Sequence, residues 1–158
     1  MPKKKAFLLG SLTLLALGLA CRTTGGAKAG QPPSLSPTLV AGYAFTLPAN
    51  QGWSDTGLQV QAGQTLRILY LSGLISDGRD ALPDASGGSY VCGRADCCEP
   101  LPDAPRGALI GRAGGQAFYI GNGGELTMPA DGFLQLRVND CDSGLYDNRG
   151  ALNLLILP

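Results

Sequence analysis

The sequence predicts an all-β domain built as a two-sheet β-sandwich, and three observations predict it. The chain of 158 residues contains 24 glycines and 11 prolines, and only 15% of it is charged. This mixture is typical of short strands joined by many turns. Short apolar segments recur between glycine-rich turns. No long stretch has the spacing of an amphipathic helix.

Eight segments are predicted to be strands. They comprise residues 41–47, 57–60, 64–72, 108–112, 117–120, 125–128, 133–138 and 151–157. The clearest alternation lies in 133–138, where Leu134, Leu136 and Val138 form one face. The last strand ends at the chain's final residues, so we expect it to lie inside a sheet and fix the C-terminus.

The N-terminus predicts export. Lysines at positions 3–5 precede fifteen uncharged residues that lead to Cys21. A basic start, a short apolar run and small residues before the cysteine indicate a secretory signal, and the run is shorter than a membrane span of about 20 residues. The cysteine makes it similar to a bacterial lipoprotein signal, which implies lipidation of Cys21. Arg22 directly after the cysteine is similar to the pattern of lipoproteins that are sorted to the outer membrane of a Gram-negative host. Ordinary secretion is the alternative.

These features divide the chain into three parts: a lipoprotein signal peptide over 1–20, a lipidated flexible tether over 21–38 and a β-sandwich domain over 39–158. Residues 22–38 are rich in Gly, Pro, Ser and Thr and hold few large apolar side chains. Such a segment buries too little surface to order itself. We therefore expect a domain tethered to a membrane of the bacterial cell envelope through a lipid on Cys21.

Composition argues against two function classes. Without residues 1–20, the chain has nine basic and twelve acidic residues, and Lys28 is its only lysine. Nucleic-acid binding, which needs a basic surface, is therefore not expected. The chain contains no histidine, which removes His-based triads, His general bases and His-ligated zinc. We therefore expect a protein that is not an enzyme.

Four cysteines lie in the predicted domain: Cys92, Cys97, Cys98 and Cys141. An exported domain with four cysteines is expected to form two disulfides. A bridge between the neighbours Cys97 and Cys98 requires a strained geometry. Cys141 is therefore expected to pair with Cys97 or Cys98, and Cys92 with the other. A zinc site of four thiolates is the alternative, although such sites usually combine two closely spaced pairs.

Two loops carry most of the polar chemistry. The irregular stretch 76–106 holds six acidic residues and three of the cysteines, and a loop of this length is usually functional or cross-linked. The second loop, 139–150, holds three aspartates and two asparagines. Oxygen donors so concentrated are typical of calcium ligands. The alternative is an ordinary surface turn, because Asp, Asn and Gly are also favoured in turns.

Residues 53–158 resemble the bacterial galactophilic lectin family, the calcium-dependent PA-IL type with a jelly-roll-like, galactose-binding-domain-like β-sandwich. The resemblance rests on an ordered series of segments. They are VQAGQTL at 60–66, Gly73, GALIGRAG at 107–114, FYIG at 118–121, PADG at 129–132, ND at 139–140 and DNRG at 147–150.

The resemblance implies one Ca²⁺ that also binds two sugar hydroxyls. Side-chain oxygens of Asp140, Asp147 and Asn148 would hold the ion together with main-chain carbonyls of Asp77 and Gly144. Asp140, Asp147 and Asn148 would also contact the sugar. Asp147 stands where the lectins have Asn, so an oxygen donor is kept and a negative charge is added.

The sugar contacts are less well matched. The lectins carry a His and a Gln in the earlier long loop, and the corresponding stretch 83–90 has neither. Tyr90 and Trp53 are candidates for stacking on a sugar, although either could serve packing alone. Two hypotheses follow: a calcium-dependent module that binds galactose-like glycans at the cell envelope, or a calcium-stabilised structural or interaction domain without sugar binding.

Overall fold

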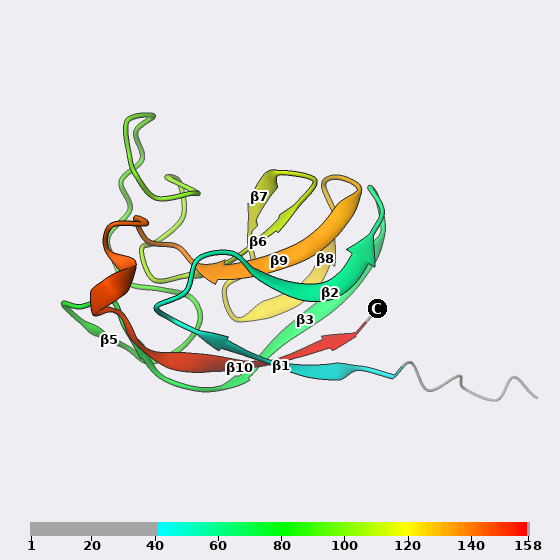
Figure 1. Ribbon diagram of the computed structural model, residues 1–158, viewed down its shortest axis with the longest axis horizontal. Coiled ribbons are helices and arrows are strands. Elements are labelled where there is room, and N and C mark those ends of the chain that lie inside the picture. The colour runs from blue at the N-terminus through cyan, green and yellow to red at the C-terminus, as the bar shows by residue number, and fades with distance from the viewer. Residues whose placement is uncertain (1–40, 158) are drawn as a thin grey trace, which may run out of the picture. The chain divides into compact units, whose positions relative to one another are not determined.

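The computed structural model describes residues 41–157, and within them ten strands form two antiparallel sheets (Figure 1). The predicted signal peptide, Cys21 and the tether lie outside the described residues. The strands are β1 (Tyr43–Pro48), β2 (Ser54–Val60), β3 (Thr65–Ser72), β4 (Ile75–Ser76), β5 (Ala81–Leu82), β6 (Leu109–Ala113), β7 (Gln116–Tyr119), β8 (Gly123–Thr127), β9 (Gly132–Val138) and β10 (Arg149–Leu157).

One sheet has the order β5-β4-β10-β3-β8, with β1 also paired to β10, and the other has the order β2-β9-β6-β7. The C-terminal strand β10 is therefore internal. It pairs with β1 along one edge and with β3 and β4 along the other. The expectation that the last strand lies inside a sheet is confirmed, as is the all-β sandwich.

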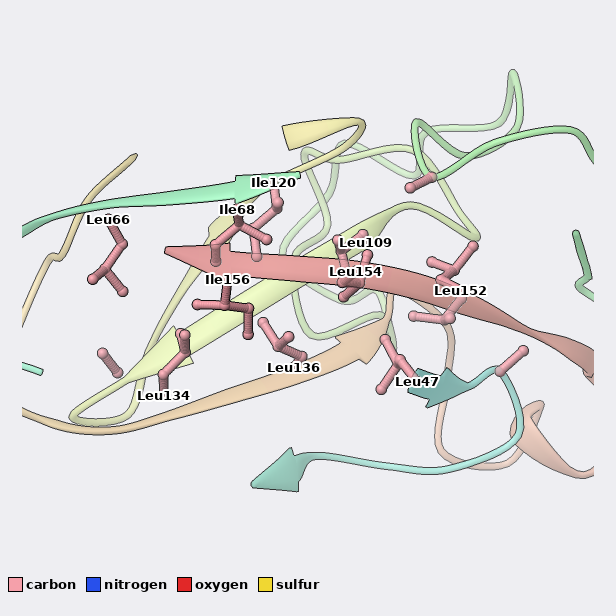
Figure 2. Close-up of a cluster of buried hydrophobic side chains, with 14 of the residues drawn as sticks. Leu47, Leu66, Ile68, Leu109, Ile120, Leu134, Leu136, Leu152, Leu154 and Ile156 are labelled. Atoms are coloured by element: carbon pink, nitrogen blue, oxygen red, sulfur yellow. The ribbon is translucent and has the colours of Figure 1, made fainter. Parts of the chain in front are cut away.

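The core lies between the two sheets, where apolar side chains from both meet (Figure 2). Leu152, Leu154 and Ile156 of β10 are almost fully buried, as are Leu134 and Leu136 of β9. Their period-two spacing puts alternate side chains on the inner face of each strand. Burying a side chain of this size contributes about 1.5–3 kcal/mol, so these alternating positions supply much of the energy that holds the layers together.

The eight predicted strands all exist, with ends that differ by up to three residues. The two-residue strands β4 and β5 were not predicted, because two residues are too few to show alternation. They pair with each other, and β4 also pairs with the first residues of β10. This pairing places the turn Asp77–Asp80 beside the point where the acidic loop enters β10.

The described residues contain one helix, the 3-10 turn η1 (Leu145–Asp147). None of the helical structure in residues 41–157 is long and apolar enough to cross a membrane. η1 lies within the acidic loop between β9 and β10, at the same end of the sandwich as the long loop after β5 (Figure 1). The two loops that the sequence marks as chemically rich therefore meet at one end of the domain.

Candidate functional site

A polar hollow of about 190 Å³ opens at this end of the sandwich. The acidic loop lines it with Asp140, Cys141, Ser143, Gly144, Tyr146 and Asp147. The β4–β5 turn adds Asp77 and Arg79, and the end of the long loop adds Arg106. Four of the five predicted calcium-ligating residues thus share one hollow. The fifth, Asn148, is fully buried and follows Asp147 directly.

Two oxygens at this site lack hydrogen-bond partners. Asp147 Oδ1 and Asn148 Oδ1 are both buried, and neither accepts a hydrogen bond. The Asn148 side-chain amide donates to the carbonyl of Ala49 at 3.2 Å, which fixes the orientation of the amide. A buried acceptor without a donor costs about 1–3 kcal/mol. A hard cation bound by both oxygens would remove this cost, because Ca²⁺ prefers carboxylate and amide oxygens as ligands.

Asp140 is held in place by its neighbours. Its side chain is only 4% exposed, and its Oδ1 accepts a hydrogen bond from the backbone N–H of Cys141 at 2.8 Å. A Cβ atom at Gly144 would come within 3.0 Å of Asp140 Oδ2, so the carboxylate lies directly against that glycine. The second oxygen of Asp140 remains available as a metal ligand.

The β4–β5 turn supplies the other wall. Asp77 Oδ1 accepts hydrogen bonds from the backbone N–H groups of Arg79 and Asp80 at 3.1 and 2.9 Å. The Asp77 carboxylate is therefore used to close the turn. The resemblance assigns the main-chain carbonyl oxygen of Asp77, not this carboxylate, as a metal ligand. Gly78 has φ +82° and a Cβ there would collide with the Asp147 carboxylate. Glycine at position 78 therefore lets this turn approach Asp147 closely.

A buried ion-pair chain backs the hollow. Arg106 donates to Glu99 Oε1 at 3.0 Å, and its Nε lies 3.6 Å from Asp140 Oδ1. Glu99 is 6% exposed. Burial alone would lower the pKa of Arg106, but the hydrogen bond to Glu99 and the charges of Asp140, Glu99 and Asp77 outweigh it and raise that pKa. Arg106 therefore stays cationic and offsets part of the negative charge gathered at the site.

Arg137 anchors the start of the acidic loop from the opposite side. It is 2% exposed and donates to the carbonyls of Val138 and Asp140 at 3.1 and 2.7 Å and to Asp142 Oδ1 at 2.8 Å. Its guanidinium also lies 5.5 Å from the ring centroid of Trp53. Arg137 lies on the face of β9 opposite Leu134, Leu136 and Val138, and it is nevertheless buried there, with Trp53 packed against it.

We expect Arg137→Met to lower the free energy of unfolding by about 2–3 kcal/mol. Two buried carbonyls lose their donor at about 1–3 kcal/mol each, and the methionine recovers part of this through apolar burial. Urea unfolding measures the change. The matched control is Asp142→Asn, which removes the ion pair but keeps the carbonyl contacts. The Asp142 side chain is 86% exposed, so the control is expected to cost under about 1 kcal/mol. Equal losses in both variants would contradict the assigned role of the backbone contacts.

The cysteines form the disulfides Cys92–Cys97 and Cys98–Cys141, with Cα separations of 6.2 and 4.9 Å. This pairing is one of the two that the sequence left open. Each of the four sulfurs is used in one of these two disulfides, so they do not form a four-thiolate zinc site. Cys98–Cys141 ties the long loop to the residue that follows Asp140. Asn139 adds a second attachment through hydrogen bonds to the carbonyls of Leu101, Ala104 and Pro105.

The two aromatic candidates lie outside the lining of the hollow. Trp53 packs under Arg112 and Arg137, at 4.4 and 5.5 Å from ring centroid to guanidinium carbon. Tyr90 is 53% exposed, and its ring centroid lies 5.0 Å from the guanidinium carbon of Arg106. Sequence reasoning missed Tyr146, the hollow's most exposed aromatic at 78%. It also missed Arg79 and Arg106, because neither stands in the acidic loop.

No protein-family model matches this chain, and no curated protein matches it significantly. Several solved structures have a similar fold, among them a chain described as the EclA N-terminal domain, a PllA-like lectin. The likeness has a TM-score of 0.56 at 21% sequence identity and covers 73% of this chain and 94% of that one. The likeness shows that the two chains share an all-β sandwich fold.

Proposed function

We propose that this protein is a calcium-dependent carbohydrate-binding module of galactose type. The observation that carries the proposal is the pair of buried, unpartnered oxygens on Asp147 and Asn148, next to a polar hollow lined by Asp140 and Asp77. The lectin fold of the similar structure supports it. The hollow of about 190 Å³ suits one sugar ring rather than an extended chain.

The proposed Ca²⁺ would be held by side-chain oxygens of Asp140, Asp147 and Asn148 and by the main-chain carbonyls of Asp77 and Gly144. The Gly144 carbonyl accepts only a long hydrogen bond of 3.3 Å from the Asp147 N–H, and a carbonyl oxygen has a second lone pair for a metal. When bound, the ion supplies open positions that accept two vicinal sugar hydroxyls. The aspartates then accept hydrogen bonds from those hydroxyls.

We propose that the module lies at the bacterial cell envelope, bound to a membrane through a lipid on Cys21. The support is the sequence of residues 1–38, with its basic start, its apolar run and its Gly- and Pro-rich stretch. A single weak site gains avidity when many copies are tethered to one surface by flexible linkers. Membrane tethering therefore fits a sugar site with few secondary contacts.

The test is titration of methyl α-D-galactoside into the calcium-loaded domain, followed by NMR. We expect millimolar to high-micromolar affinity, about −4 to −6 kcal/mol, with chemical-shift changes at Asp147 and Asn148. The changes should vanish when a chelator removes calcium. A broad glycan panel with and without chelator extends the test. If calcium binds but no glycan on the panel perturbs the spectrum, the carbohydrate-binding proposal is wrong.

The second candidate is a calcium-stabilised structural or interaction domain. The observation that favours it is the stretch 83–90, which lacks the His and Gln of the lectins and is held by its own contacts. Asp84 Oδ1 accepts hydrogen bonds from the Ser86 hydroxyl and the Ser86 backbone N–H. These bonds, the hydroxyl first, lower the pKa of Asp84. The glycan panel separates the two candidates, since only the first predicts sugar-dependent shifts.

A further inference from the structure

Arg79 is a cation at the rim of the hollow without a counter-ion. It lies in the β4–β5 turn, where its backbone N–H is fixed by Asp77 Oδ1 at 3.1 Å. Its side chain is exposed and lines the hollow. Within residues 41–157 its guanidinium forms no ion pair. The turn therefore holds the start of this side chain in place and leaves the charged end free.

Two other arginines, Arg106 in the lining of the hollow and Arg149 directly after Asn148, are already engaged. Arg106 pairs with Glu99 and lies near Asp140. Arg149 donates to the carbonyls of Tyr146 and Asn148 at 3.0 and 2.8 Å and thereby supports η1. Arg79 differs from both, because no partner within the described domain accounts for its position at the hollow.

An arginine without a counter-ion next to the proposed calcium site weakens the binding of the metal. Two cations repel, and the repulsion grows when a ligand displaces the water between them. A neutral sugar gains little from the arrangement. A sugar that carries a carboxylate changes this balance, because the anion is attracted to both cations, and a guanidinium forms bidentate, charge-assisted hydrogen bonds with a carboxylate.

We propose that the site prefers an anionic sugar, a galactose-type hexuronic acid whose carboxylate binds Arg79; this inference rests on the proposed function. Two vicinal hydroxyls of such a sugar would bind the metal, and its carboxylate would bind Arg79, which lines the same hollow. Tyr146, exposed on the same hollow, offers an aromatic face to the C–H groups of the ring. The ligand class is therefore an acidic glycan with a free vicinal diol.

The experiment compares three monosaccharides on the calcium-loaded domain: D-galacturonic acid, its methyl ester and methyl α-D-galactoside. The methyl ester keeps the ring and its hydroxyls, removes the charge at C6 and adds one methyl group there. We expect the acid to bind about tenfold more tightly than the ester and the galactoside, the effect of one partly exposed charge-assisted contact. The difference should shrink as salt is added, because exposed charges are screened. Calcium is kept in large excess, so that weak chelation by free uronate does not deplete the site.

The variant Arg79→Gln tests the residue. It should bring the acid and the ester to equal affinity, because the guanidinium that binds the carboxylate is lost. Arg67→Gln is the matched control, since Arg67 is an exposed arginine on β3 that does not line the hollow. It should keep the tenfold preference. If the galactoside binds and the acid binds no better, the inference is wrong and the proposed function stands. If calcium binds and none of the three sugars does, both are wrong.

Discussion

Asp140→Asn is expected to weaken calcium binding by at least about a hundredfold, the largest single effect among these predictions. Asp140 is almost fully buried, one of its oxygens is already bonded to the Cys141 N–H, and the other faces the hollow beside Gly144. The asparagine keeps the first contact through its carbonyl oxygen and presents an amide NH₂ in place of the second oxygen. A donor group cannot ligate a cation.

The measurement is isothermal titration of calcium into wild type and variant, together with melting curves. At a calcium concentration a hundred times the wild-type dissociation constant, binding stabilises the fold by about 2.7 kcal/mol. This corresponds to roughly 10 °C in melting temperature for a domain of this size. The variant should lose most of that gain.

Asp142→Asn is the control for this experiment, because it removes the same charge from the same loop at an exposed residue that does not line the hollow. It should change calcium affinity by less than about threefold, since exposed charges are screened. Equal losses in both variants would mean that general loop charge, not ligation by Asp140, holds the ion. If the folded wild type binds no calcium at millimolar concentration, the proposed calcium site is wrong.

Loss of the Cys98–Cys141 disulfide is expected to cost about 4 kcal/mol of unfolding free energy. The bridge closes a loop across a sequence separation of 43, and in the chain-entropy model a long closed loop restricts the unfolded chain most. Replacing both cysteines by serine and measuring urea unfolding gives the value. Because Cys141 follows Asp140 directly, calcium affinity should fall in the same variant.

The matched control is the double serine variant of Cys92 and Cys97, whose bridge has a sequence separation of only 5. The same model gives about 2 kcal/mol for this short loop. Its sulfurs also lie away from the acidic loop in sequence, so calcium affinity should hold. A short-loop variant as destabilised as the long-loop variant would argue against the entropic origin of the effect.

Much of the fold could be predicted from local pattern. Leu134, Leu136 and Val138 alternate with polar neighbours, and all three are buried in β9. A strand with one buried face needs this period whatever its partner is. Pairing is different. That β10 lies between β1 on one edge and β3 and β4 on the other depends on contacts between segments up to about a hundred residues apart, and period alone does not select partners.

The candidate site, like the fold, could be predicted only in part. The oxygen donors of the acidic loop stand out because Asp140, Asp147 and Asn148 lie within nine consecutive residues. Their environment does not. Arg137 looks like an outward-facing residue of β9 and is buried under Trp53. Burial of a charge requires partners from elsewhere in the chain, and no local pattern reports them.

Residue type and short-range period account for the fold class, the cysteine and oxygen-donor inventory and eight of the ten strands. The cysteine pairing, the meeting of the β4–β5 turn with the acidic loop, and the position of Arg79 at the hollow depend on contacts between distant segments of the chain. Position 79 is about 60 residues from the acidic loop along the chain. The pairing of β4 with β10 brings them together, because backbone hydrogen bonds between strands join segments regardless of their separation in sequence.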